Sequence, residues 1–465
     1  MEGHTVLMST MPLRAGHYRT VFTASLGQLT GTALATTVGV VIPLMLIVGR
    51  PELSASMQGL VGAADLIGIA AGSAVLGPIA DRRGYLAMFR ACPVLIMLAA
   101  AVAALVPSLP VLLVCLFVMG FGIGGEYTLD SGYVSEIMPV KWRSTMVGVT
   151  KAASAAGNII AAWLCFMVLS GGLEASHWPR LMWIIAGIAA FMALTRVGFV
   201  QSPLWLLKHG HTAQAEAAAE KLLGPDVRVA TAAQPAAPAT PRSSAGTLAF
   251  MRDNAARVVL SGLPWACEGL GVYGIGVFLP VLVAALGLEH FTPQMAPAAH
   301  VTKSVEITLW ISCIMLPGFI AGLLLLRRAG KVSLQAWGFF LSAVSLALLM
   351  AAYEFRWPSW TAIGAFMAFE LFLNMGPHLV TYIMPAAIYP VADRARGAGI
   401  AACVGKIGAV LGVFFMPVLL HAGGMRLVLA VSIGVMLLGG FVTASAGRIV
   451  CRRRAAGVRA SKQEA

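Results

Sequence analysis

The sequence predicts an all-α membrane protein in which twelve membrane-spanning helices form two pseudo-symmetric six-helix bundles. Of its 465 residues, 59% are hydrophobic and only 11% are charged, whereas a soluble protein carries roughly 25% charged residues. The apolar runs are long and continuous, which favours helices of about 20 residues over the alternating strands of a barrel. Motifs of the first half also recur in the second half, which indicates a duplicated bundle.

The first half contains six apolar runs that predict the first bundle. The expected spans are residues 22–48, 57–79, 87–106, one that begins near residue 110, 145–169 and 180–200. Span 1 carries Gln28, Thr32 and Thr36 at intervals of four, so they share one helical face. Span 2 is rich in Gly and Ala, which allow helices to approach closely.

A polar segment, residues 201–255, divides the chain into halves. It holds an Ala-rich helix that should stop at Gly224–Pro225, followed by a flexible Pro/Ala/Ser linker. The remaining spans are expected at 257–285, 304–326, 333–353, 358–384, 397–420 and 425–446. The predicted organisation is therefore a segment 1–21, a bundle 22–200, the segment 201–255, a bundle 256–447 and a basic tail 448–465.

The net charge of +13 does not indicate nucleic-acid binding, because the basic residues lie in loops between apolar runs. Among the 32 Lys and Arg residues, those in the odd-to-even connections are Arg50, Arg180, Lys303, Arg356 and Arg426. Lys406 is intramembrane and the rest lie on the other side. Positive residues mark the cytoplasmic side, so both termini and the central segment are expected there, in a bacterial-type inner membrane.

Nothing in the sequence indicates an enzyme, a metal site or a cofactor. The seven Cys residues are scattered, no phosphate-binding loop is present, and no catalytic triad or zinc pattern occurs. Ala33–Leu34–Ala35 mimics a signal-peptide cleavage site, but the apolar run continues to Val48, which favours a first membrane helix.

The stretch 120–148 in span 4 is unusually acidic for a membrane helix. Glu126 and Asp130 lie four residues apart and so share a face. Carboxylates inside a bilayer are costly and usually line a cavity or a proton path. We therefore expect proton coupling or substrate contact here, with a structural ion pair to Lys or Arg as the alternative. Asp130 could instead serve the charged turn that runs from Glu136 to Arg143.

The second half repeats the first when it is displaced by 251 residues. The matches are Pro139 with Pro390, Arg143 with Arg394, Gly148 with Gly399 and Gly157 with Gly408. A displacement of 246 places DRRG at 81–84 over RRAG at 327–330. Internal repeats with a substrate site at their interface are typical of transporters.

These motifs resemble the major facilitator superfamily over nearly the whole chain. GPIADRRG is similar to its G-x-x-x-D-R-x-G signature, which places Gly77, Asp81, Arg82 and Gly84 in a cytoplasmic latch, although Tyr85 replaces a basic residue. The resemblance implies that Glu136, Arg143 and Arg394 belong to the same charge network. GGEYTLDSGYVSEIMPVKWRS, SPLWLL and VGKIGAV look like the sugar-porter and metabolite:proton-symporter branches.

Other polar residues in the spans are candidates for function. Besides Asp130 and Glu126, the proton-coupling candidates are Glu268, Glu370 and Asp65, and the substrate-binding candidates are Gln28, Asn158, Asn374, His378 and Lys406. Glu268 lies where true sugar porters carry paired Gln, and Glu370, Asn374 and His378 are expected on one helical face. Lys406 either neutralises an acid such as Glu370 or Asp130, or attracts an anionic substrate. Glu306 is expected to pair locally with Lys303.

The expected function is secondary active transport of a small polar metabolite, an organic acid or a sugar-like compound, by alternating access and proton symport. The expected partners are the small-molecule substrate, H⁺ and membrane lipids, with no nucleic acid and a monomeric state. A drug/proton antiporter and a transporter-like membrane sensor are the alternatives.

Overall fold

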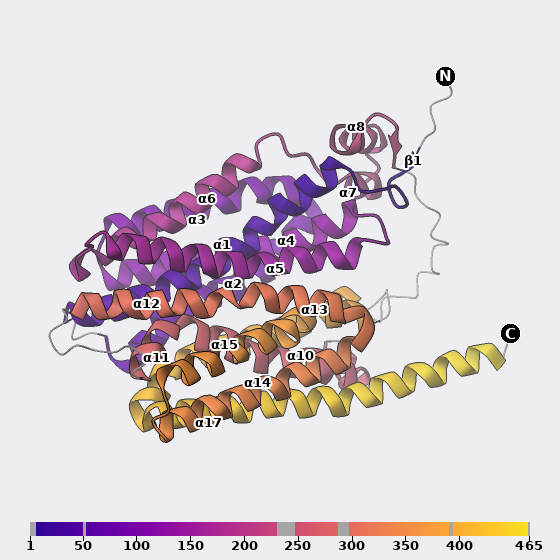
Figure 1. The fold of residues 1–465 in the computed structure, drawn as a ribbon. Coiled ribbons are helices and arrows are strands. Elements are labelled where there is room, and N and C mark those ends of the chain that lie inside the picture. The colour runs from indigo at the N-terminus through magenta and orange to yellow at the C-terminus, as the bar shows by residue number, and fades with distance from the viewer. Residues whose placement is uncertain (1–5, 50–52, 230–246, 287–296, 390–393, 464–465) are drawn as a thin grey trace. The chain divides into compact units, whose positions relative to one another are not determined.

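The structure is a computed structural model that describes residues 6–49, 53–229, 247–286, 297–389 and 394–463. The chain divides into two compact units. Unit 1 takes its described residues from Met1–Leu53, Leu60–Pro235 and Pro297–Glu306, and unit 2 takes them from Ser54–Gly59, Ala236–Ala296 and Ile307–Ala465. Each unit is helical, as the continuous apolar runs predicted (Figure 1).

Unit 1 contains most of the helices of the first half. Their bounds are α1 (Ala15–Ile47), α2 (Ala55–Arg83), α3 (Tyr85–Leu105), α4 (Leu109–Ile137), α5 (Arg143–Ser170), the 3₁₀ helix η1 (Ala175–Leu181) and α6 (Met182–Thr195). The first helix begins earlier than the predicted span, at Ala15. Short helices α7 (Pro203–Lys208) and α8 (Thr212–Leu223) follow. Gly224 ends α8 with φ of 115°, as its sequence position predicted.

Unit 2 contains helices that are more often broken. Their bounds are α9 (Thr247–Asp253), α10 (Ala255–Gly269), the π-helix η2 (Leu270–Ile275), α11 (Leu279–Ala285), α12 (Pro297–Cys313), α13 (Met315–Ala329), α14 (Lys331–Glu354), α15 (Ser359–Met375), α16 (Pro377–Ile388) and α17 (Arg394–Gln463). The first part of α12, Pro297–Glu306, belongs to unit 1. Predicted spans 11 and 12 both lie in α17, which is interrupted at Gly424. Among the described residues, 11 helical segments are long and apolar enough to cross a membrane, consistent with twelve spans once α17 is divided.

Two pairs of glycines that the sequence repeat aligns have similar backbone angles or similar close contacts in the structure. Gly84 precedes α3 with φ 85° and ψ 166°, and Gly330 precedes α14 with φ 77° and ψ 155°. This region of positive φ is favourable only for Gly. Gly157 and Gly408 both lie against a neighbouring helix. An added Cβ would come within 2.1 Å of the Leu29 carbonyl oxygen and 2.3 Å of the Ala266 carbonyl oxygen, respectively. The displacements that align the sequence therefore align equivalent backbone positions within each unit.

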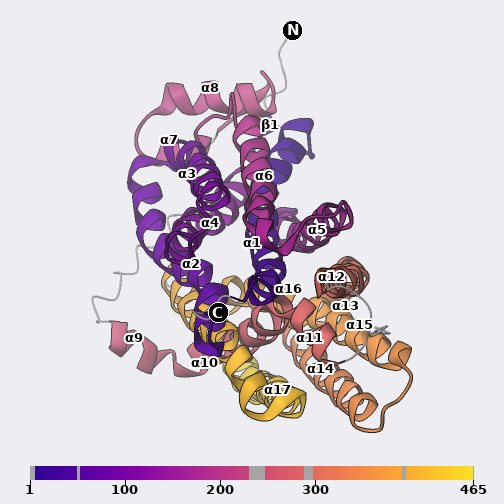
Figure 2. The same cartoon turned by 90° about the vertical axis from the view of Figure 1, so that its left-hand side faces the viewer.

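A small cap covers one end of unit 1, where α7 and α8 lie beside β1 (Figures 1 and 2). Strand β1 (Val6–Leu7) pairs in parallel with β2 (Val227–Arg228), which the sequence did not predict. Arg14 binds Asp226 through two hydrogen bonds of 2.6 Å and donates another to the Leu223 carbonyl at 2.8 Å. Hydrogen bonding to Arg14 lowers the pKa of Asp226 to about 2 and raises the pKa of Arg14. The expected flexible linker lies mostly in 230–246, outside the described residues.

Candidate functional site

Arg196 joins the two acidic residues of α4 in the interior of unit 1. It follows the last residue of α6, and its Nη1 and Nη2 donate to the two carboxylate oxygens of Glu126 at 2.7 and 2.5 Å. Its Nη2 also lies 3.9 Å from Asp130 Oδ1. All three side chains are at most 1% exposed. The predicted shared face of Glu126 and Asp130 is present, and a single guanidinium faces both carboxylates.

The apolar surroundings hold the Arg196 guanidinium in this position. Its Nη1 also donates to the Phe89 carbonyl at 2.9 Å, and its Cζ lies 4.5 Å from the centroid of the Phe89 ring. Phe89 packs edge-on against Tyr133 and Phe199. A cation over an aromatic face, with its hydrogen bonds directed by a carboxylate, tolerates burial that an unpaired Arg would not.

Asp130 is held less completely than Glu126. In the described part of the chain, neither of its carboxylate oxygens has a hydrogen-bond donor. The carboxylate lies directly against α1, since a Cβ on Gly27 would come within 2.2 Å of Asp130 Oδ2. Two ionised carboxylates facing one guanidinium leave a net charge of −1, and one added proton cancels it. The arrangement can therefore bind a proton without moving another ion.

A Lys or Arg partner for this pair was the structural alternative in the sequence analysis, with Lys406 named for Asp130, and Arg196 was not identified. The signal was present, because Arg196 interrupts the apolar run FMALTRVGFV of predicted span 6. A cation within a predicted span is a candidate partner for the buried acids of another span.

A line of polar side chains joins α1 to α5 within unit 1. The Thr32 hydroxyl donates to the Ser154 carbonyl at 2.7 Å, and the Thr36 hydroxyl donates to Asn158 Oδ1 at 2.5 Å. Gln28, one turn earlier on the same face, is 1% exposed. Two substrate-binding candidates, Gln28 and Asn158, thus lie on facing helices of one unit, and the predicted stripe on span 1 faces α5.

A polar end cluster (Tyr85, Glu136, Ser202 and Lys208) lies where α3, α4 and α7 meet. The Tyr85 hydroxyl donates to Glu136 Oε1 at 3.2 Å, the Ser202 hydroxyl binds Glu136 Oε2, and Lys208 Nζ lies 3.6 Å from Glu136 Oε1. The SPLWLL motif is thus tied to the acidic end of α4. Lys208 was not singled out from the sequence.

The remaining motif residues surround this end of the unit. Gly84 is buried, Gly77 and Arg143 are half-buried, and Arg82 is exposed. The side chains of Asp81 and Arg394 lie outside the described part of the structure. The predicted latch between the halves therefore stays a prediction.

Two further acids, Asp65 and Glu306, make contacts with residues other than Arg196. Asp65 is 2% exposed on α2, and its Oδ1 accepts from the Leu66 amide at 2.7 Å. The predicted local pair of Glu306 is confirmed, because Lys303 Nζ lies 2.8 Å from Glu306 Oε2. The pair lies within α12 and not at a helix start, because α12 begins at Pro297.

In unit 2, Glu268 and His378 form a buried pair that the sequence did not predict. His378 Nδ1 lies 2.8 Å from Glu268 Oε1, and the two side chains are 1% and 3% exposed. The residues lie at helix breaks, because η2 follows Glu268 on α10 and Gly376, with φ −112° and ψ −85°, precedes α16. The Phe319 ring packs edge-on against His378.

The predicted stripe of Glu370, Asn374 and His378 on one helix is wrong. Asn374 does contact Glu370 on α15, since its Nδ2 donates to Oε2 at 3.0 Å. Gly376–Pro377 then ends α15, because Pro cannot continue the hydrogen-bond ladder, and His378 begins the next helix. Lys406 Nζ lies 4.9 Å from the centroid of the Tyr273 ring. The expected stripe is thus divided: Glu370 and Asn374 contact each other, and His378 contacts Glu268.

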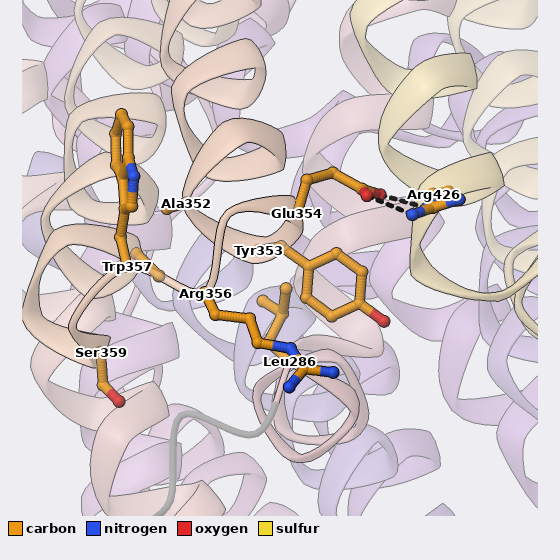
Figure 3. Close-up of a pocket in the computed structure, with 9 residues that line it drawn as sticks. Leu286, Ala352, Tyr353, Glu354, Arg356, Trp357, Ser359 and Arg426 are labelled. Carbon is orange, nitrogen blue, oxygen red and sulfur yellow. Dashed lines mark hydrogen bonds and ion pairs between the residues drawn. The ribbon is translucent and has the colours of Figure 1, made fainter.

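A cavity of about 560 Å³ lies in unit 2 beside Glu354 and Arg426. Figure 3 shows the ion pair between these two side chains, with Arg356 and Trp357 lining the same hollow. Arg356 adopts a φ of 51°, which is uncommon for a residue with a Cβ. This cavity lies apart from every site candidate named from the sequence.

The buried charged and polar side chains are suited to binding ions and polar solutes within helical bundles. The described residues contain no group of three or more His, Cys, Asp or Glu side chains placed to hold a metal ion. Buried charges within long apolar helices mark substrate and ion pathways in membrane proteins. Together, the fold and these sites define a multi-pass membrane transporter of the major facilitator type.

Comparison with known proteins identifies the family. A sequence model of the family described as "Sugar (and other) transporter" matches residues 12–446, so the chain belongs to this family. The inner membrane metabolite transport protein YgcS of Escherichia coli is 25% identical, with 95% of this chain and 94% of that protein covered. The putative niacin/nicotinamide transporter NiaP of Bacillus subtilis is 25% identical over 78% of each chain.

Solved structures share the fold. The xylose transporter XylE of Escherichia coli, in a partially occluded inward-open conformation, matches with a TM-score of 0.77 and 17% identity over 93% of this chain and 98% of its own. Another structure describes XylE as a proton:xylose symporter of the major facilitator superfamily and matches with a TM-score of 0.70. The expectation that the chain is a transporter and not an enzyme is confirmed by its family.

Proposed function

We propose that this protein is a proton symporter that carries a small polar metabolite, an organic acid or a sugar-like compound, across the inner membrane. The bundles 22–200 and 256–447 move against each other in alternating access, and the protein works as a monomer. Both termini and the segment 201–255 lie in the cytoplasm. The excess of Lys and Arg in the even-to-odd connections supports this orientation.

The cluster of Arg196, Glu126 and Asp130 is the observation that carries the proposal. Arg196 already satisfies both oxygens of Glu126, whereas Asp130 lies 3.9 Å away and has no hydrogen-bond donor in the described part of the chain. A proton on Asp130 makes the cluster neutral. Because the cost of a net charge inside a membrane protein depends on its exposure to water, loading and release of this proton can follow alternating access.

Polar residues in both units support a route for a hydrophilic substrate. Gln28 and Asn158 lie on the α1–α5 face of unit 1, and Asn374, His378 and Lys406 lie in unit 2. We propose these as substrate-facing groups, with Glu268, Glu370 and Asp65 as further proton-coupling candidates. The description of XylE as a proton:xylose symporter and of YgcS as a metabolite transport protein supports the same class of activity.

Uptake into proteoliposomes with an imposed pH gradient tests the proposal. The probes are radiolabelled D-xylose, nicotinate, succinate and inorganic phosphate, each with the interior alkaline and with empty liposomes as the control. Accumulation above the external concentration that collapses with a protonophore supports proton symport. Accumulation unchanged by collapse of both the pH and the voltage gradients rejects it.

The same assay distinguishes the two alternatives. Expulsion of a cationic dye driven by an inward proton gradient, without uptake of the polar probes, would identify a drug/proton antiporter. Saturable binding of a probe without flux in either direction would identify a sensor.

A further inference from the structure

The cavity of unit 2 beside Glu354 and Arg426 lies between the ends of two apolar helices. Residues at the end of α14 line it, together with Ser359 at the start of α15. The segments Lys331–Glu354 and Ser359–Pro385 are long and apolar enough to cross a membrane. The cavity is therefore placed at an end of both spans, where the hydrocarbon of a bilayer meets its head groups.

Exposed aromatic side chains surround the turn that joins these two helices. Trp357 and Trp360 are 44% and 73% exposed, and the Phe355 ring stacks on Trp357 with a centroid distance of 6.3 Å. Trp is enriched at the membrane–water interface, where its ring lies at the level of the head groups. Trp357 also lines the cavity, so the aromatic residues support a head-group level for this site.

Two positive charges and one negative charge line the cavity among the described residues. Arg426 donates through Nε and Nη2 to both carboxylate oxygens of Glu354, so these two charges cancel. The Arg356 guanidinium supplies the remaining charge, and Figure 3 shows it beside Leu286 and the Tyr353 ring. Arg356 and Arg426 both belong to the odd-to-even connections, which are otherwise poor in Lys and Arg. Two of these rare cations therefore meet at one cavity.

The backbone holds Arg356 in a conformation that favours glycine. The Trp357 amide donates to the Ala352 carbonyl at 2.9 Å, and the Arg356 amide donates to the Tyr353 carbonyl at 3.4 Å. These are the two bonds of a Schellman motif, whose left-handed position is usually Gly. Here that position is Arg356, with φ 51°. Because strained residues are concentrated at ligand sites, an Arg at this position indicates a role for its side chain.

The donors around the cavity suit a phosphate group. Arg binds phosphate oxygens through two parallel N–H groups, and Tyr353 and Ser359 add hydroxyl donors to the lining. Ser359 is the first of the 17 residues of α15, and a helix dipole is positive at that end. Leu286 and Ala362 make part of the lining apolar. This combination matches the phosphate and glycerol of a lipid better than it matches a hydrated ion.

We propose that this cavity binds the head group of an anionic phospholipid, with the lipid phosphodiester on the Arg356 guanidinium. A soluble phosphate shares this chemistry, but the interfacial Trp residues and the apolar part of the lining favour a lipid. A zwitterionic head group fits less well, because the Glu354 carboxylate that would receive its cation already binds Arg426. The site does not depend on the proposed proton coupling.

Native mass spectrometry of the full-length protein, purified in detergent and stripped of lipid, tests the proposal. Phosphatidylglycerol is added, and the number and affinity of the bound molecules are measured. Phosphatidylcholine with the same acyl chains is the zwitterionic comparison. Basic residues elsewhere, such as those of the tail, also attract anionic lipids. The measured quantity is therefore the change in the number of tightly bound phosphatidylglycerol molecules between the wild type and each variant.

Substitutions at Arg356 assign one of these lipids to the cavity. Arg356→Gly and Arg356→Gln should each lose one tightly bound phosphatidylglycerol, with an affinity at that site about tenfold lower. Arg356→Lys should keep it. Arg180→Gln, at an exposed residue of another odd-to-even connection, is the matched control and should bind as the wild type does. Lipid-free Arg356→Gly should melt no lower than the lipid-free wild type, because Gly accommodates a positive φ.

Glycerol 3-phosphate and inorganic phosphate distinguish a lipid from a soluble anion. Neither should displace the lipid that depends on Arg356. The proposal is overturned if phosphatidylcholine occupies the site as tightly as phosphatidylglycerol, or if the folded Arg356→Gly and Arg356→Gln variants keep every tightly bound phosphatidylglycerol. Binding of either soluble anion as tight as that of the lipid, with the same dependence on Arg356, would also overturn it and assign the cavity to a soluble oxyanion.

Discussion

Arg196 and Glu126 form a bidentate ion pair between the end of α6 and the middle of α4, with N–O distances of 2.7 and 2.5 Å. Both side chains are at most 1% exposed. The pair fixes these two helices to each other within unit 1 and leaves Asp130 as the second carboxylate beside the guanidinium. The stability of the unit and the proposed chemistry therefore depend on the same group of atoms.

Removal of Arg196 should destabilise unit 1 severely. Arg196→Met leaves Glu126 buried without its cation, and breaking a buried ion pair costs about 3–5 kcal/mol. The double variant Arg196→Met, Glu126→Leu should recover part of this loss, since no unpaired charge remains. Thermal unfolding in detergent measures both. A double variant no more stable than Arg196→Met would contradict the role of the unpaired charge.

The close contacts of the repeated glycines predict equal sensitivity in both units. Gly157→Ala and Gly408→Ala each drive a methyl group into a backbone carbonyl, at 2.1 and 2.3 Å, and should cost about 1–3 kcal/mol. Gly187→Ala in α6 is the control, because nothing lies within 4 Å of its added Cβ. Melting temperatures should fall for the first two and not for the third. Equal melting temperatures in all three would refute this packing.

Glu268 and His378 should be energetically coupled. Their side chains are buried and 2.8 Å apart, so Glu268→Gln and His378→Gln remove one shared interaction. A double-mutant cycle on thermal stability should give a coupling energy of about 0.5–3 kcal/mol. The pair Gln335–Thr443, bonded at 3.1 Å elsewhere in unit 2, offers a reference that should not couple to Glu268. Additive effects of the two Gln variants would show that the contact contributes no stability.

The cap of unit 1 should loosen only in strong acid. The pKa of Asp226 is lowered to about 2 by its hydrogen bond to Arg14, so folding favours the ionised form. This contribution is complete above the unfolded value of about 3.9 and is lost as pH falls toward 2. Protection of the β1 amides from hydrogen exchange, relative to an unfolded peptide at the same pH, should fall over that range. In Asp226→Asn the β1 amides should already exchange fast at neutral pH. Unchanged protection in this variant would show that the Arg14–Asp226 ion pair does not hold the cap in place.

The fold could be predicted from the sequence because its signals are local and repeated. The apolar runs defined the spans, and the displacement of 246 residues predicted that Gly84 and Gly330 are equivalent, which their backbone angles bear out. The site was harder. Residue spacing places Glu126 and Asp130 on one face, but it does not show which helix brings the cation, and Arg196 lies some 70 residues away in sequence.

The error at His378 has a different cause. An i, i+4 pattern predicts a shared face only while the helix continues, and Gly376–Pro377 interrupts it. The dipeptide was visible in the sequence and should have limited the stripe to Glu370 and Asn374. The contact of His378 with Glu268 is a tertiary one, 110 residues apart in sequence, and no local pattern encodes it.

Proton-driven uptake by Asp130→Asn tests the central claim most directly. The variant is compared with the wild type in proteoliposomes, using the probe that the wild type accumulates, in both uphill uptake and exchange at equal concentrations. Because Asn cannot release a proton, the account predicts that uphill accumulation falls to the equilibrium level while exchange continues. Accumulation by Asp130→Asn equal to that of the wild type, and still abolished by a protonophore, would contradict it.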